Sequence, residues 1–222
     1  MLNNKKRKEE RLHMIIDSNQ EISENYYNLW LGGSIAYGII MNVISVAFFE
    51  DFFLSINPWV FLILYFVSCV TGTIIATKSQ NPLFSFLGYN LIVLPIGGLL
   101  TICLREYKGI DIQSAMIVTG IIVAIMTFAS IVKPNLFLGL GRTLFIGLSL
   151  GLIGQIIALL LGYGGNLFNW FFVILFSLYI AYDYAKAQEY PKTIDNAIDS
   201  AIDIYLDIIN LFIRLLSIFS DD

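Results

Sequence analysis

Polar side chains form one stripe along the last apolar segment of this 222-residue chain. Successive members of the stripe are four, four, three, four and three positions apart, which averages to the period of an α-helix. The members are Asp199, Asp203, Asp207, Asn210, Arg214 and Ser217. An ionisable side chain in the middle of a bilayer costs roughly 2.5–3.5 kcal/mol on insertion scales. Because the residues around the stripe are apolar, we expect this helix to lie inside a bundle, where the stripe faces a path or another helix.

A further acid, Asp183, lies near the end of the preceding apolar segment, and a short polar loop follows it. Two antiparallel helices joined by this loop can bring Asp183 opposite Asp203 or Asp207, and the sequence leaves open which of the two. Two carboxylates held together away from bulk water cannot both ionise at low cost, so such a pair can share one proton. The pair therefore predicts a pH switch that joins the helices when protonated and favours separation or a bound cation when ionised.

The other polar residues of the last segment have simpler interpretations. Thr193 or Asp195 can cap the helix, and we expect Asp195 and Asp199 to be solvated in its first turns. Asn210 can pack through its amide against a neighbouring helix. We expect Arg214 to snorkel outward, although it can also form a positive constriction next to the acids.

The composition predicts an all-α polytopic membrane protein. The chain is 57% hydrophobic and 14% charged, with a mean hydropathy of +0.75, which lies outside the range of soluble domains. Seven apolar runs each approach the ~20 residues that cross a bilayer. They are Tyr27–Phe49, Trp59–Thr77, Leu83–Leu104, Ile112–Val132, Thr143–Tyr163, Leu167–Ala185 and Asn196–Phe219. Within the fifth run, the four-residue spacing of Gly147 and Gly151 predicts a close helix–helix approach.

Basic residues define the expected orientation. Residues 1–24 form a polar amino-terminal tail, and residues 25–222 form the seven-helix domain. The first run is too long for a cleaved signal peptide, and the positive-inside rule places the tail in the cytoplasm. Counted alternately, the inner loops contain Lys78, Lys133, Arg142, Lys186 and Lys192, and the outer loops contain Arg105 and Lys108.

Two segments resemble a known family. Ser200–Leu216 resembles the carboxy-terminal signature of the transmembrane Bax inhibitor motif family, and Phe176–Asp183 resembles the sixth helix of that family. The resemblance implies a central seventh helix wrapped by the other six. It also implies that Asp183 and Asp207 are paired aspartates that couple protonation to opening, and that Lys78 is a basic partner of the pair. Asp203, Arg214 and the Ser217–Asp222 ending depart from the family pattern.

We predict a pH-sensitive, calcium-permeable leak channel rather than an enzyme. Asp183 and Asp207 are the pH-sensing gate and contact a weakly bound, permeant calcium ion, while Asp203, Asn210 and Arg214 line the pore. The partners are the lipid bilayer, calcium and protons, with no nucleic acid. The sequence leaves the oligomeric state open and is compatible with a monomer. The expected location is the cell membrane, or the endoplasmic reticulum membrane if the source is eukaryotic.

Three other functions remain open at this point. An intramembrane aspartyl protease also uses two carboxylates around a water molecule. A proton-coupled transporter would use the acids for protons and a third helix broken at Pro95 for its site. A membrane interaction or regulatory protein would need neither flux nor cleavage.

Overall fold

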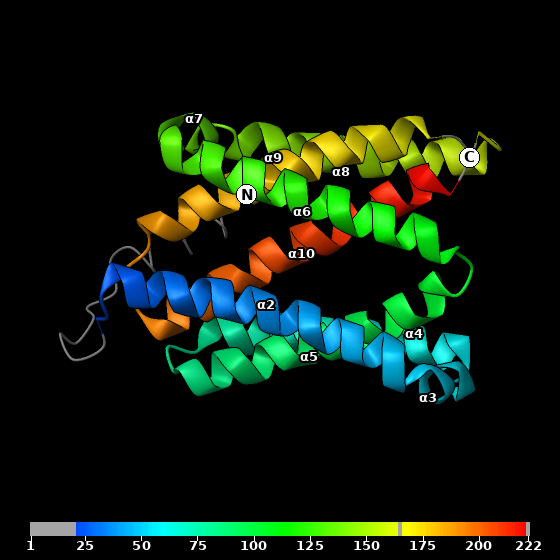
Figure 1. The fold of residues 1–222 in the computed structure, drawn as a ribbon, viewed down its shortest axis with the longest axis horizontal. Helices are drawn as coiled ribbons and strands as arrows, with labels where there is room; N and C mark the ends of the chain where they lie inside the picture. Colours follow the sequence, from blue (N-terminus) through cyan, green and yellow to red (C-terminus); the bar gives the residue numbers. More distant parts are fainter. Residues whose placement is uncertain (1–20, 164–165, 221–222) are drawn as a thin grey trace. The chain divides into compact units, whose positions relative to one another are not determined.

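The computed structural model describes residues 21–163 and 166–220, and within these ranges it contains helices and no strands. The long helices of this part are shown in Figure 1: α2 (Glu24–Phe48), α4 (Pro58–Lys78), α5 (Pro82–Leu104), α6 (Gly109–Val132), α8 (Gly141–Leu160), α9 (Leu167–Glu189) and α10 (Ile194–Phe219). Each covers one of the predicted runs to within a few residues. Two short helices, α3 (Glu50–Ser55) and α7 (Pro134–Leu138), lie in connections and were not predicted.

Six of the long helices, α2, α4, α5, α6, α8 and α9, are long and apolar enough to cross a membrane. The all-α, multi-span prediction is therefore confirmed to that extent. The last helix, α10, forms over the predicted run but is more polar than the other six. It carries the charged residues Asp195, Asp199, Asp203, Asp207 and Arg214.

Several helices begin at side chains that satisfy their free amide groups. Asn57 and Asn81 accept hydrogen bonds from the first turns of α4 and α5, whose first residues are prolines. The Thr193 hydroxyl accepts a hydrogen bond from the Asn196 amide at 3.1 Å, so Thr193 caps α10 as the sequence suggested. The helix starts thus follow local sequence signals.

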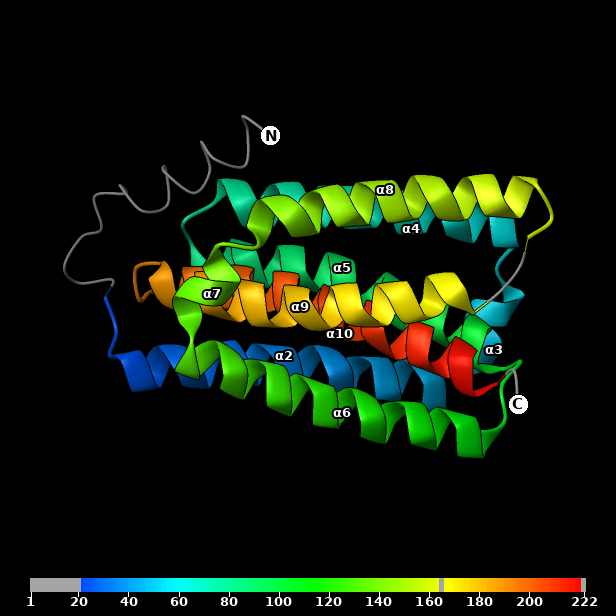
Figure 2. The same ribbon diagram turned by 90° about the horizontal axis from the view of Figure 1, so that it is seen from above.

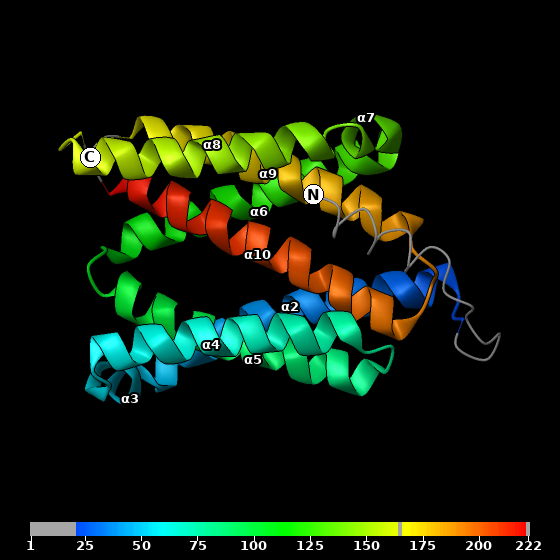
Figure 3. The same cartoon turned by 180° about the vertical axis from the view of Figure 1, so that it is seen from behind.

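The chain divides into two compact units. The first unit contains the described residues up to Arg105 and also Glu189–Ile202, so it includes α2 to α5 and the beginning of α10. Within it α4 and α5 lie side by side (Figure 3). A Cβ atom added at Gly88 would lie 2.5 Å from the Gly72 carbonyl oxygen, so only glycine allows this backbone approach.

The second unit contains Glu106–Gln188 and the rest of α10 from Asp203. Figure 2 shows α7 linking α6 to α8. The Ser130 hydroxyl of α6 donates to the Ala181 carbonyl oxygen of α9 at 2.7 Å. Gly151 of α8 faces Phe171 of α9, where an added Cβ would be 2.5 Å from the ring. The predicted close approach along Gly147 and Gly151 is thus confirmed, with α9 as the partner helix.

The predicted tail and the predicted ending extend beyond the residues that the structure describes. Residues 1–20 of the predicted tail 1–24 lie outside the described residues, as do Asp221 and Asp222. The helix α2 begins at Glu24, where the Ser23 hydroxyl accepts a hydrogen bond from the Tyr26 amide. The division into a tail and a seven-helix domain stays a prediction.

Candidate functional site

Asp183 lies on the side of α9 opposite its packed alanine face. Ala181 and Ala185 form a buried core cluster with Phe137 of α7, and Asp183 lies two residues from each alanine. Because two residues of an α-helix correspond to about 200° of rotation, the alanine face and the Asp183 side chain point in opposite directions. Packing of the alanines thereby orients Asp183, which is only 9% exposed.

The helix α10 brings Asp203 and Asp207 to one face, because they are four residues apart. Asp207 is 8% exposed, and its carboxyl lies within hydrogen-bonding reach of the Asp183 carboxyl. A hydrogen bond between two carboxyl groups requires one proton. The Oδ2 atom of Asp207 is buried and accepts no hydrogen bond from the residues that the structure describes. These features make Asp183 and Asp207 a candidate proton-sharing pair.

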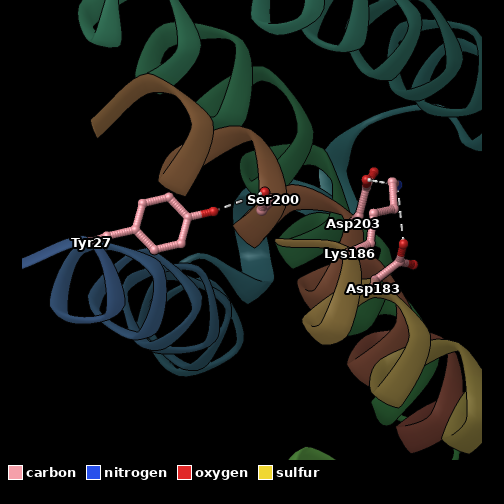
Figure 4. A network of polar contacts seen from close by, with 5 residues as sticks. All are labelled: Tyr27, Asp183, Lys186, Ser200 and Asp203. Carbon is pink, nitrogen blue, oxygen red and sulfur yellow. Dashed lines mark hydrogen bonds and ion pairs between the residues drawn. The ribbon is translucent and has the colours of Figure 1, made fainter. Parts of the chain in front are cut away.

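Lys186 links the acids of the two helices (Figure 4). Its Nζ atom lies 3.1 Å from Asp183 Oδ1 and 3.0 Å from Asp203 Oδ2. The Lys186 side chain is 19% exposed and the Asp203 side chain 47%, so this ion pair lies at the wetter edge of the site. We call Asp183, Lys186, Asp203 and Asp207 the acid–lysine cluster.

The sequence left open whether Asp203 or Asp207 lies opposite Asp183. Asp183 faces Asp207 directly and is joined to Asp203 through Lys186. Lys186 was assigned to an inner loop, and this was wrong because α9 continues to Glu189. Its spacing of three residues from Asp183 was the local signal for the ion pair. Lys78, the expected basic partner, is the exposed last residue of α4, and its pairing stays a prediction.

The expectation that Asp195 and Asp199 are solvated was wrong. They are 8% and 4% exposed, because the first turns of α10 pack within the first unit. The buried Ser85 hydroxyl of α5 donates to Asp195 Oδ1 at 2.5 Å. Figure 4 also shows the contact of this region between the hydroxyl oxygens of Tyr27 and Ser200, which are 3.5 Å apart.

The remaining residues of the stripe have their own partners. Asn210 donates to the Leu206 carbonyl oxygen of its own helix at 2.8 Å. Arg214 does not extend freely outward: its guanidinium donates to Asn169 Oδ1 and Gln155 Oε1, each at 3.1 Å. The expected snorkelling is therefore replaced by hydrogen bonds to amides of α8 and α9.

The acid–lysine cluster is not arranged as a resident metal site. In residues 21–163 and 166–220, no group of three or more His, Cys, Asp or Glu side chains is positioned to hold a metal ion. A resident calcium ion takes six to eight oxygen ligands. The arrangement can exchange a proton between Asp183 and Asp207, and it presents carboxylate oxygens on one side.

Comparison with known families places the chain among known proteins. Residues 19–222 match the family described as inhibitor of apoptosis-promoting Bax1. The chain belongs to this family. The resemblance predicted from the last two helices is thereby confirmed, and six apolar helices in a member of the Bax inhibitor family indicate a multi-pass membrane protein. A search of curated proteins found no match.

Proposed function

We propose that this Bax inhibitor family member is a calcium-permeable leak channel whose gate is the pair Asp183 and Asp207. The observation that carries the proposal is that two buried carboxyls on successive helices face each other within an apolar membrane protein. When protonated, the pair shares a hydrogen bond that holds α9 to α10. When ionised, the carboxylates repel each other and attract a cation.

The charges of the acid–lysine cluster support a divalent cation. With Asp183 and Asp203 ionised, Lys186 protonated and Asp207 neutral, the four side chains carry a net charge of −1. Loss of the Asp207 proton makes this −2, which equals in magnitude the charge of one calcium ion. Deprotonation therefore creates the charge that a calcium ion can balance.

The small number of oxygen ligands suits transit rather than storage. Conduction requires a cation to leave as readily as it enters, so a partly hydrated contact with two or three carboxylates is favourable. In this proposal Asp203 and Asn210 line the path beside the gate. Most side chains of α10 are buried, which supports its assignment as a seventh crossing.

We further propose a cell-membrane location with the amino terminus in the cytoplasm. This orientation follows from the excess of Lys and Arg in alternate connections. Lys78, at the end of α4 that this orientation places inside, remains a candidate basic partner of the gate. An endoplasmic reticulum location would apply to a eukaryotic source.

A channel accounts for the acid–lysine cluster better than a protease. An aspartyl protease needs both carboxyls free to position a water molecule. Here Asp183 is already bound by the Lys186 ammonium at 3.1 Å, so it is not free to position a water molecule. We therefore infer that the protein is not an enzyme.

Calcium uptake into liposomes that contain the purified full chain tests the proposal. We expect flux to rise with pH by at most about tenfold per pH unit, as expected for a single controlling proton. Asp207→Asn and Asp183→Asn should each remove this pH dependence, because an amide neither titrates nor repels its partner. Asp51→Asn, which changes an exposed acid of α3, is the matched control and should retain it.

Two results would contradict the proposal. Calcium uptake that never exceeds that of empty liposomes would exclude the channel. Uptake whose pH dependence survives in both variants would place the gate elsewhere.

A further inference from the structure

A second polar cluster lies in the same unit as the acid–lysine cluster and has the opposite charge. The guanidinium of Arg214 donates to Gln155 of α8 and Asn169 of α9, each at 3.1 Å, and the Asn169 amide donates to Ser217 of α10 at 3.1 Å. The guanidinium carbon lies 4.3 Å from the centre of the Phe172 ring. We call Arg214, Gln155, Asn169 and Ser217 the guanidinium–amide cluster. Three helices thus converge on one half-buried cation.

The charge of this cluster is not balanced within the described part of the chain. Arg214 forms no ion pair with any acid of residues 21–163 and 166–220, and its partners there are two neutral amides and a ring. A half-buried cation in an apolar bundle is costly unless an anion compensates it. The amides and the ring orient the guanidinium without neutralising it.

The hydrogen-bond inventory also favours an anion. The oxygen atoms of the Gln155 and Asn169 amides must face Arg214, since a guanidinium has donors only. The Gln155 NH₂ group therefore points away from Arg214 and donates to no described residue. A guanidinium has five N–H groups, and two of them make the bonds to these amides. The unused groups of the cluster are thus N–H donors next to a positive charge, which suits a ligand with several acceptor oxygens.

The cluster lies at the level of the membrane interface. Gln155 is five residues before the end of α8, Asn169 is the third residue of α9, and Arg214 is five residues before the end of α10. At a rise of 1.5 Å per residue, all three are within about 8 Å of a helix end. Trp170 and Tyr163, which are 52% and 74% exposed, flank the same region. Exposed aromatic residues of this kind mark the depth of lipid headgroups.

We propose that the guanidinium–amide cluster binds the phosphate group of a membrane phospholipid, through the guanidinium of Arg214 and the amide NH₂ of Gln155. The exposed apolar side chains around it, including Leu160 and Leu167 at 80% each, would contact the acyl chains. This assignment replaces the pore-lining role expected for Arg214 and does not depend on calcium flux.

Native mass spectrometry of the purified full chain in detergent tests this site with three probes. They are dioleoyl-phosphatidylglycerol, dioleoylglycerol, which has the same chains but no phosphate, and inorganic phosphate. We expect the unmodified chain to retain one phosphatidylglycerol molecule at concentrations where dioleoylglycerol is not retained. Arg214→Gln should weaken retention about tenfold. Arg214→Lys should weaken it about threefold, because lysine keeps the charge but lacks the planar set of N–H donors of a guanidinium.

Two further variants keep the test decisive. Gln155→Met keeps the charge of Arg214 but removes the whole amide, both its NH₂ donor and the oxygen that accepts from Arg214. It should weaken retention about threefold even if Arg214→Gln folds poorly. Arg142→Gln removes an exposed arginine at the start of α8 and should have no effect. Equal retention of both lipids, or equal loss in the Arg142 and Arg214 variants, would overturn the site. Binding of inorganic phosphate that blocks the lipid would support the cluster, whereas phosphate binding without lipid retention would overturn the lipid as its ligand.

Discussion

The two polar clusters of the second unit share α9 and α10 but differ in charge, and the guanidinium–amide cluster also includes Gln155 of α8. The acid–lysine cluster joins α9 and α10 through three carboxyls and one ammonium, and the guanidinium–amide cluster joins them through one guanidinium and neutral amides. Asp207 and Arg214 are seven residues apart on α10, which corresponds to about 10 Å. A polar stripe with one helical period therefore contributes to two separate polar clusters.

The difference shows why the stripe should not be treated as one pore lining. The acids face partners that can exchange a proton, so the charge of this cluster can change with pH. Arg214 faces groups that do not titrate, so its charge is constant. Proton-dependent behaviour is therefore expected from one end of the α9–α10 contact, and constant anion binding from the other.

Among the substitutions that distinguish the two clusters, removal of Lys186 should have the largest effect on the pH midpoint of calcium flux. Lys186→Met leaves Asp183 and Asp203 without their shared cation, so the acids ionise less readily. We expect the pH midpoint of calcium flux to rise by about one unit, which corresponds to about 1.4 kcal/mol. The apparent melting temperature in detergent should fall by several degrees, since a partly buried ion pair loses one partner.

Lys186→Arg is the matched control, because it keeps the charge between the two helices. It should shift the midpoint of flux much less than Lys186→Met. An unchanged midpoint in Lys186→Met would mean that the ammonium does not act on the gate. Phosphatidylglycerol retention should be unchanged in both variants, since neither contacts the guanidinium–amide cluster.

Local patterns in the sequence predicted the long helices and the two central acids. Asp183 and Asp207 were identifiable because each is an ionisable residue within an apolar run. Lys186 was missed as a site residue because the apolar run ends at Ala185, whereas the helix continues for another turn to Glu189. Its contact with Asp203 depends on the antiparallel packing of α9 and α10.

Contacts between distant residues could not be predicted in this way. The burial of Asp195 depends on Ser85, which is 110 residues away. The amides that hold Arg214 lie 45 and 59 residues before it, and a single neutral amide in an apolar run gives no sign of its partner. Local periodicity identifies the face of a helix, but only tertiary packing determines which residues meet that face.

A substitution of Gly151 should disturb the guanidinium–amide cluster alone. In Gly151→Ala the new Cβ would lie 2.5 Å from the Phe171 ring and 3.1 Å from the Phe172 ring, which stacks on Arg214. Overpacking of this kind costs about 1–3 kcal/mol. We expect a lower melting temperature and weaker phosphatidylglycerol retention, with an unchanged pH midpoint of flux.

Gly120→Ala provides the comparison for this effect. Gly120 of α6 has no atom within 4 Å of an added Cβ, so the same change should leave stability and lipid retention as they were. A midpoint of flux that moved in Gly151→Ala and not in Gly120→Ala would show that the two clusters are mechanically coupled.

Ser217→Ala should have the smallest effect on stability and on lipid retention. It tests whether the guanidinium–amide cluster depends on Ser217, which contacts Asn169. The Asn169 amide loses the Ser217 oxygen at 3.1 Å but keeps Asn166 Oδ1 at 3.0 Å, and the bond from Arg214 to Asn169 remains. A single part-buried hydrogen bond contributes about 0.5–1.5 kcal/mol to stability. Because the Asn169 amide keeps Asn166 as an acceptor, we expect the loss of stability to lie at the low end of this range. The melting temperature should change by at most about 2 °C, and phosphatidylglycerol retention by less than about twofold.

Ser149→Ala, which removes a hydroxyl bonded to its own helix in α8, is the control for this prediction. Since Ser217 has no part in proton exchange, any shift of the flux midpoint in Ser217→Ala would contradict the separation of the two clusters.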